Sequence, residues 1–323
     1  MARVLITGAT GFIGSHLARA CLARGDAVTV MARPSSSLDR LENLAGRLDV
    51  RRLDLADTPA VTACLNASRP EIIFHAGART RYAAPADLMD MAESVDDNLT
   101  PLFSLLSAAA NASDPPRVLV RTGTIAEYGD TELPYTETQC AFPRNAYGAS
   151  LLAGTQYMSM ARSRLPFDAV TARLALTYGP GQSRDFLIPH LVDQLLKGEA
   201  VTIARPDDRR DLIYVDDVVA ALLQIAENPE PVGPMVNVCS GEAPRMGEVA
   251  LMLLRATKAA RDLVEISQQT SQPVELVCDG GHMAETLSWS AGVPLFDGLE
   301  RTVQWAKHKS QLLHPSEQRL AAI

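Results

Sequence analysis

Residues 2–14 read ARVLITGATGFIG, and this stretch decides the fold. An apolar run at 4–6 precedes three spaced glycines, Gly8, Gly11 and Gly14, and a helical pattern of apolar residues follows. This order predicts a strand, a glycine-rich turn and a helix. Gly8 and Gly11 remove Cβ where the chain turns tightly and a pyrophosphate approaches the backbone, and Gly14 lets the helix lie close to the strand. We therefore expect a dinucleotide here, with its phosphates at the N-terminus of the helix.

Composition and charge exclude several classes of protein. The chain has 323 residues and a net charge of −8, which argues against a general affinity for nucleic acid or anionic membranes. No apolar run is long enough to span a membrane, and no signal-peptide pattern is present. The 5 cysteines are scattered without metal-ligand spacing, so neither a zinc site nor a disulfide framework is expected. We expect a cytoplasmic protein.

Strands and helices alternate along the first half of the chain. Further strands are expected at 27–31, 48–53, 72–75, 118–121 and 167–174, and long helices at 87–111 and 147–163. This alternation predicts an α/β fold, a Rossmann-type doubly wound parallel sheet. Beyond the YGPG turn at 178–181 the pattern becomes less regular, as in a smaller C-terminal α+β substrate lobe. The expected division is a dinucleotide-binding domain at 1–175 with a returning segment near 208–240, a substrate lobe at 176–207 and 241–310, and a tail at 311–323.

The end of the second strand bears on the choice of cofactor. An NAD-binding unit has Asp or Glu there to accept a hydrogen bond from the ribose 2′-hydroxyl. This chain has Ala32, followed by Arg33 and a run of serines that includes Ser36. Arginine and hydroxyl groups bind a 2′-phosphate, which a carboxylate would repel. The sequence therefore favours NADP over NAD, with a solvated charge at Arg33 as the alternative interpretation.

Other strand ends contribute further candidates for ligand binding. Asp54 is placed to meet the adenine amino group, although it could cap the next helix, for which Asp57 is the better candidate. The small residues at 76–78 let the backbone pass close to a ligand, and Arg79 follows them at the edge where such sheets bind ligands. His75, before them, is expected to be structural.

These pieces together resemble the extended short-chain dehydrogenase/reductases, the nucleotide-sugar epimerase/dehydratase group. The resemblance covers almost the whole chain in the right order, and it is carried by TGATGFIG at 7–14, Asp54-Leu55, FHAGA at 74–78, Asn98, TGTIAEYG at 122–129, YGAS at 147–150, YGPG at 178–181, RDLIYVDDV at 210–218 and NVCSG at 237–241.

The resemblance implies hydride transfer at a sugar carbon. It gives Tyr147 the role of proton donor or acceptor and Thr124 a hydrogen bond to the same sugar oxygen. The implied cofactor-binding residues are Gly8, Thr10, Gly11, Phe12, Ile13, Gly14, Arg33, Ser36, Asp54, Leu55, Ala76, Gly77, Ala78, Asn98, Thr122 and Tyr147. The implied substrate-binding residues are Arg79, Thr124, Arg184 and Arg210, and the alternative for Arg210 is a salt bridge to Asp211 or Asp216.

One position departs from the family pattern. The family has a lysine four residues after the tyrosine, where this chain has Leu151. That lysine favours the phenolate, and leucine cannot do so. Three interpretations remain open: a reductase that uses neutral Tyr147 as the proton donor, another cation such as Arg79 or Arg81 in place of the lysine, or a non-catalytic, cofactor-binding protein.

The residues around the predicted site also bear on the reaction. Ile125 and Ala126 stand where dehydratases of the family carry acids, so 4,6-dehydration is disfavoured, and Glu127 is expected to be a salt-bridge partner in a loop. Arg33 and its serines favour reduction with NADPH. The GPGQS turn at 179–183 and the NVCSG segment at 237–241 resemble those of reductases of nucleotide-linked 4-keto-6-deoxy sugars, and a nucleotide-sugar 4-epimerase is the alternative. In this family the helices at 87–111 and 147–163 would form a four-helix bundle in a homodimer.

Overall fold

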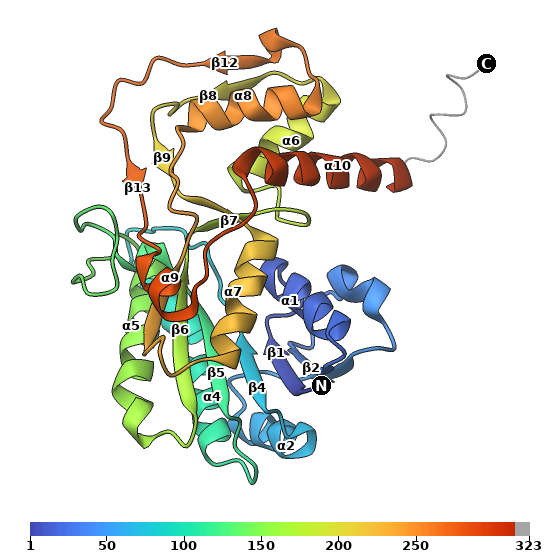
Figure 1. Cartoon of the computed structure of the whole chain (residues 1–323), viewed down its shortest axis with the longest axis vertical. Coiled ribbons are helices and arrows are strands. Elements are labelled where there is room, and N and C mark those ends of the chain that lie inside the picture. The colour runs from blue at the N-terminus through green and yellow to red at the C-terminus, as the bar shows by residue number, and fades with distance from the viewer. Residues whose placement is uncertain (314–323) are drawn as a thin grey trace. The chain divides into compact units, whose positions relative to one another are not determined.

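A seven-stranded parallel sheet forms the centre of the first of two compact units in the computed structural model, which describes residues 1–313 (Figure 1). The order of its strands is β11-β6-β5-β4-β1-β2-β3. These strands are β1 (Arg3–Thr7), β2 (Ala27–Ala32), β3 (Asp49–Arg52), β4 (Ile72–His75), β5 (Val118–Thr124), β6 (Asp168–Leu174) and β11 (Met235–Val238). The order runs outward from β1 in both directions, which confirms the predicted doubly wound fold.

Helices cover both faces of this sheet. The helices of the unit are α1 (Phe12–Ala23), α2 (Thr58–Ser68), α3 (Met89–Asn98), α4 (Thr100–Ala110), α5 (Ala146–Ala161), α7 (Val215–Glu227) and α9 (Gly281–Leu287), with short 3-10 turns η1 (Asp39–Leu44), η2 (Ile125–Glu127) and η3 (Arg162–Arg164). Apolar residues of α2, α4 and α5 pack with Leu5, Ile73 and Leu119 of the sheet in one buried core. On the other face α1 lies beside α7 (Figure 1), and Arg24 pairs with Glu227 at 2.8 Å.

The helix expected at 87–111 is two helices. α3 ends at Asn98 and α4 begins at Thr100, with Pro101 in its first turn. Proline has no N–H and its ring clashes with the preceding turn, so it is tolerated at the start of a helix but not inside one. The prediction of one continuous helix is therefore wrong, and the break places Asn98 at the end of α3.

The second unit comprises residues 176–215, 240–277 and 291–313 of the described chain. Its helices α6 (Leu187–Lys197), α8 (Met246–Thr257) and α10 (Leu295–Leu313) pack on one another. Three parallel strand pairs accompany them: β7 (Leu176–Tyr178) with β10 (Leu212–Tyr214), β8 (Val201–Ile203) with β12 (Val264–Ile266), and β9 (Arg209–Arg210) with β13 (Glu275–Leu276). A further 3-10 turn, η4, spans Arg261–Leu263.

The chain returns to the first unit twice, at 216–239 and at 278–290. The sequence suggested one return, near 208–240, and assigned 278–290 to the substrate lobe. In the structure Gln224 of α7 donates to the Leu287 carbonyl at 2.6 Å, and Asn237 donates to the Asp279 carbonyl at 3.3 Å. The tail expected at 311–323 begins inside α10, which runs to Leu313, and residues 314–323 lie outside the described part of the chain.

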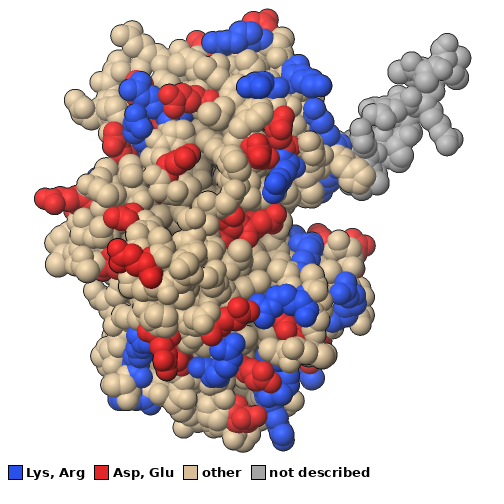
Figure 2. Space-filling model, in the orientation of Figure 1, with Lys and Arg blue, Asp and Glu red and all other residues tan. Residues whose placement is uncertain are grey.

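Two surface properties bear on possible partners. Among residues 1–313, no helix combines the length and the apolar character needed to cross a membrane. On the face drawn in Figure 2, basic and acidic side chains are intermixed and do not form one large patch of either sign.

Candidate active site

The glycine-rich turn brings the ends of β1 and β4 into close contact. Gly8 has a φ of +72°, and a Cβ there would lie 2.5 Å from the Ala76 carbonyl oxygen. A Cβ on Gly14 would lie 2.3 Å from the carbonyl oxygen of Gly8, so this turn and the start of α1 also leave no room for a side chain. No side chain caps α1 and its first turn has no acid, although the first N–H groups of a helix lack partners within it. This cradle fits the phosphates of a dinucleotide.

The turn after β2 is held by an arginine from β3. The N–H of Ser36 donates to the Arg33 carbonyl at 3.0 Å, and Arg52 Nη1 donates to the carbonyls of Arg33, Pro34 and Ser36 at 3.1, 3.0 and 2.7 Å. The Arg33 side chain itself is exposed. An ordered turn therefore presents a basic side chain at the end of β2, where a carboxylate would select against a 2′-phosphate.

The two aspartates after β3 have different roles. Asp57 Oδ1 accepts from the N–H of Ala60 at 3.1 Å and caps α2, as expected. Asp54 is exposed and accepts from the N–H of Ala56 at 3.0 Å, while Leu55 packs against the core. One carboxylate oxygen of Asp54, the residue predicted to meet adenine, thus accepts a hydrogen bond from the backbone two residues further on.

Thr124 and Tyr147 come together where β5 ends and α5 begins. Asn145 caps α5 through its Oδ1, which accepts from the N–H of Gly148 at 2.8 Å. The side chain of Thr124 faces the phenol of Tyr147 and favours its ionised form. Burial raises the pKa of Tyr147, and neither Thr124 nor the charge of Arg121 offsets that rise. The phenol is therefore protonated at neutral pH and can act as an acid.

Glu127 holds the backbone of Thr124 in place through a hydrogen bond. Its side chain is fully buried, and Oε1 accepts from the N–H of Thr124 at 3.0 Å while Oε2 accepts from the Thr155 hydroxyl at 2.8 Å. Oε2 also pairs with Arg173 Nε at 2.8 Å. The expected salt-bridge partner is thus a buried anion that joins β5, α5 and β6, and not a residue of an exposed loop.

His75 is structural, as expected. It is buried at the end of β4, and its Nδ1 shares a hydrogen bond of 2.7 Å with the Thr7 hydroxyl of β1. Burial and the neighbouring charge of Arg121 lower the pKa of His75 to about 3. The imidazole is therefore neutral at physiological pH. The hydroxyl of Thr122 donates to the His75 carbonyl at 3.4 Å, which joins β5 to the same strand end.

Asn98 joins the segment after β4 to α5. Its Oδ1 accepts from the N–H of Arg79 at 3.0 Å, and its Nδ2 donates to Ser150 Oγ at 2.9 Å. The Arg79 guanidinium turns to α3, where it pairs with Glu93 at 3.0 Å and Asp97 at 3.1 Å. Two carboxylates therefore already balance the charge of this predicted substrate residue.

The other two arginines predicted to bind substrate lie in the second unit. Arg210 Nη2 pairs with the buried Asp208 at 2.8 Å, and its Nη1 donates to the carbonyls of Arg209 and Val274. The ion-pair partner of Arg210 within the second unit is thus Asp208, where the sequence had offered Asp211 or Asp216. Asp211 accepts from the N–H groups of Ser240 and Gly241 at 2.9 and 3.0 Å. Arg184 is exposed and pairs with Asp193 at 3.2 Å.

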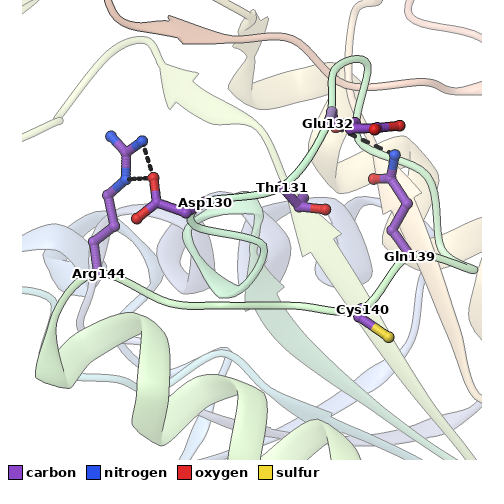
Figure 3. A pocket seen from close by; sticks show the side chains of 6 residues that line it. All are labelled: Asp130, Thr131, Glu132, Gln139, Cys140 and Arg144. Carbon is purple, nitrogen blue, oxygen red and sulfur yellow. Dashed lines mark hydrogen bonds and ion pairs between the residues drawn. The ribbon is translucent and has the colours of Figure 1, made fainter.

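A separate depression lies in the loop between η2 and α5 (Figure 3). Its volume is about 500 Å³, and it is lined by Asp130, Thr131, Glu132, Gln139, Cys140 and Arg144. Figure 3 shows Arg144 facing Asp130, with which it forms an ion pair, and Gln139 reaching toward Glu132. None of the predicted site residues lines it. Among the described residues, no group of three His, Cys, Asp or Glu side chains is arranged to hold a metal ion.

The first unit thus brings together the turn of β1, the end of β4, and the Thr124–Tyr147 pair. Two buried charges beside that pair, Arg121 and Arg173, were not selected from the sequence. The sequence did carry a signal for them: one charged residue follows the apolar run 118–120, and another lies inside the run 169–174. A charge in a buried strand needs a partner, so each of these positions indicates a buried ion pair or hydrogen-bond network.

Comparisons with known proteins agree with this geometry. The model of the NAD dependent epimerase/dehydratase family matches residues 4–239. A UDP-glucose 4-epimerase of Mycolicibacterium smegmatis is 28% identical over 96% of this chain and 100% of its own length. A dTDP-4-dehydro-6-deoxy-D-allose reductase of Streptomyces bikiniensis is 26% identical over 95% of this chain and 97% of its own. The solved UDP-glucose 4-epimerase of Thermus thermophilus in complex with NAD matches with a TM-score of 0.81 and 26% identity, over 94% of this chain and 98% of its own.

Proposed function

The chain belongs to the NAD dependent epimerase/dehydratase family, and within that family we propose that it is an NADPH-dependent reductase of a nucleotide-linked keto-sugar of the 4-keto-6-deoxyhexose type. One observation carries the proposal. Tyr147 is buried beside Thr124, and burial raises its pKa, so the phenol holds a proton at neutral pH. A reductase needs that acid in its first chemical step, whereas the oxidation that opens an epimerase cycle needs a base. The reductase of Streptomyces bikiniensis among the relatives supports this choice.

The proposed chemistry balances with the residues present. When bound, the nicotinamide supplies a hydride to the carbonyl carbon of the sugar. Tyr147 gives its phenolic proton to the carbonyl oxygen as negative charge develops there, and the Thr124 hydroxyl holds that oxygen and the phenol in line. The products are an alcohol and a tyrosinate, which takes a proton from water. Arg79, Arg184 and Arg210 remain the proposed contacts of the substrate.

The experiment that tests this role compares two tyrosines of α5. Tyr147→Phe should lower turnover of a panel of keto-sugar nucleotides about 100- to 10,000-fold while NADPH binding is retained. Tyr157→Phe is the matched control, because Tyr157 lies on the same helix with its side chain half exposed, and phenylalanine keeps the ring that contacts Phe103. Unchanged turnover in Tyr147→Phe would refute the proposed role of the phenol.

The preference for NADPH rests on the turn after β2. Arg33 is exposed at the end of a strand that carries no acid, and Arg52 holds the turn in place. A fluorescence titration with NADPH and NADH should give tighter binding of NADPH. Arg33→Ala should weaken NADPH binding about tenfold, a loss of about 1.4 kcal/mol, and leave NADH unaffected. Arg47→Ala, another exposed arginine, should change neither affinity, and equal losses for both cofactors would contradict the assignment.

A 4-epimerase is the second candidate, and the relative in Mycolicibacterium smegmatis favours it. An epimerase regenerates its cofactor in every cycle. Interconversion of two nucleotide sugars without net consumption of NADPH would therefore identify it, whereas stoichiometric oxidation of NADPH identifies the reductase. The predicted cytoplasmic location is compatible with either activity.

We also propose that the helices α3, α4 and α5 bind a second copy of this chain. Their exposed apolar side chains include Met91, Val95, Phe103, Tyr157 and Met160, and the rings of Phe103 and Tyr157 contact each other at 4.8 Å between centroids. Exposed apolar side chains that gather on neighbouring helices often mark an interaction surface. Sedimentation should show a dimer that Phe103→Glu converts to a monomer, and a monomeric parent protein would refute the proposal.

A further inference from the structure

Arg121 is a cation buried inside the sheet of the first unit. It is 2% exposed, on β5, between His75 of β4 and Thr171 of β6. A guanidinium in such a place is retained only if its donors and its charge are used, because removing it from water costs several kcal/mol. What Arg121 contacts therefore indicates its role.

The guanidinium lies against α5. Nη1 donates to the Leu151 carbonyl at 3.1 Å and to Thr155 Oγ1 at 3.2 Å. A Cβ on Gly154 would lie 2.7 Å from Nη2 and 2.8 Å from Cζ, so the helix has a glycine where the guanidinium touches it. Leu151 is the position, one turn after Tyr147, at which the family carries a lysine. The chain thus brings a positive charge to this turn from the strand, and not from the helix.

The charges around Arg121 leave one positive charge in excess. Four other titratable groups face Arg121: Glu127 of η2, Arg173 of β6, His75 of β4 and Tyr147 of α5. Glu127 and Arg173 pair at 2.8 Å and balance each other. His75 is neutral at physiological pH, because burial lowers its pKa to about 3. Glu127 also attracts Arg121, but the two arginines and the one carboxylate together keep a net positive charge, which is neutralised when Tyr147 loses its proton.

We propose that Arg121 stabilises the tyrosinate formed when Tyr147 donates its proton, and so replaces the lysine that is absent at Leu151. Arg121 is a positioning residue, because it acts through Tyr147 and does not touch the substrate. The inference rests on the proposed function in that it takes Tyr147 as the proton donor. Arg79, considered from the sequence as the substitute cation, is instead paired with Glu93 and Asp97.

The test measures the pKa of Tyr147 directly and does not depend on turnover. The near-ultraviolet absorbance of tyrosinate is titrated in each protein and in the same protein with Tyr147→Phe, and the difference belongs to Tyr147. Arg121→Gln keeps a donor for the Leu151 carbonyl and removes the charge, so the pKa of Tyr147 should rise by about one unit or more. Arg121→Lys restores the charge and should keep the pKa near that of the parent protein.

Two further comparisons make the result decisive. Arg117→Gln is the matched control, because Arg117 precedes the same strand but donates to the Ala226 carbonyl at 2.7 Å, and it should leave the pKa of Tyr147 unchanged. Equal pKa values in Arg121→Gln and Arg121→Lys would indicate a purely structural role and overturn the inference. A shift in pKa without turnover of any keto-sugar would refute the proposed function and leave the role of Arg121 intact.

A last variant applies if Arg121→Gln does not fold. Leu151→Lys adds the family lysine to a chain whose Arg121 already serves that turn. Turnover should then change less than threefold. A larger increase would show that Tyr147 lacked a cation, which would overturn the inference.

Discussion

The buried anion Glu127 offers the sharpest test of how the site is held together. Its carboxylate accepts hydrogen bonds from the Thr124 N–H and the Thr155 hydroxyl and pairs with Arg173 at 2.8 Å. Glu127→Gln keeps the volume and one carbonyl acceptor for the Thr124 N–H. The substitution removes a negative charge that acts on both Arg121 and Arg173. Among the described residues, Glu127 is the one carboxylate that acts on both arginines. The expected result is a strong loss of stability.

The size of the loss follows from the burial of the pair. Glu127 and Arg173 have side chains 0% and 3% exposed, so solvent screens their charges little. Removing one partner of a buried pair costs about 3–5 kcal/mol, and the retained amide acceptor places this variant near about 3 kcal/mol. At about 2–4 °C per kcal/mol, the melting temperature should fall by about 6–12 °C. The pKa of Tyr147 should also fall, because the Glu127 charge raises it.

Thermal unfolding followed by circular dichroism at neutral pH is the assay. Glu132→Gln is the matched control, since Glu132 is exposed in the following loop, and its melting temperature should change by no more than about 1 °C. Adding Arg173→Met to Glu127→Gln should restore part of the stability, because it removes the charge left without a partner. A loss below about 2 °C for Glu127→Gln would refute the reasoning.

Three more predictions address other parts of the chain. Gly8→Ala forces a side chain into a φ of +72° and against the Ala76 carbonyl, so calorimetry should show NADPH binding weakened at least about tenfold, and unchanged affinity would contradict the cradle. The folded-state pKa of His75 is depressed to about 3 from an ordinary value of about 6.5, so below pH 6.5 the unfolded chain binds a proton that the folded chain does not. Stability should therefore fall from pH 6.5 toward 3 by up to about 1.4 kcal/mol per pH unit, and denaturant unfolding of His75→Gln at pH 7 and 5 should show a shallower fall. Asp208 holds Arg205 and Arg210 at 2.8 Å each, so Asp208→Asn should lower the free energy of unfolding by about 3 kcal/mol in urea, and a loss below about 1 kcal/mol would count against this role.

Local signals in the sequence predicted the elements of the first unit well. The glycines of residues 7–14 and the apolar runs of β2, β4 and β6 depend on neighbouring residues alone, and the structure confirms the strands they predicted. The proximity of Thr124 and Tyr147 also came from the motif. The helix predicted at 87–111 failed at Pro101 because the apolar periodicity continues across the break while the backbone cannot.

Contacts between distant residues were outside the reach of these signals. The segment 278–290 joins the first unit through Asn237, which lies 42 residues before Asp279. Arg210 pairs with Asp208 and donates to the carbonyl of Val274, which lies 64 residues further along the chain.

The sequence by itself determined the doubly wound fold, the dinucleotide cradle and the absence of the family lysine at Leu151, since each is carried by residue types at short, readable spacings. The tertiary structure alone decided which cation faces the turn at Leu151. Arg121 lies on β5, 30 residues before Leu151, and donates to the Leu151 carbonyl. Its guanidinium fits against α5 because Gly154 has no side chain there. The physical reason is that burial and charge balance depend on every element that packs around a group, and no spacing along one element records them.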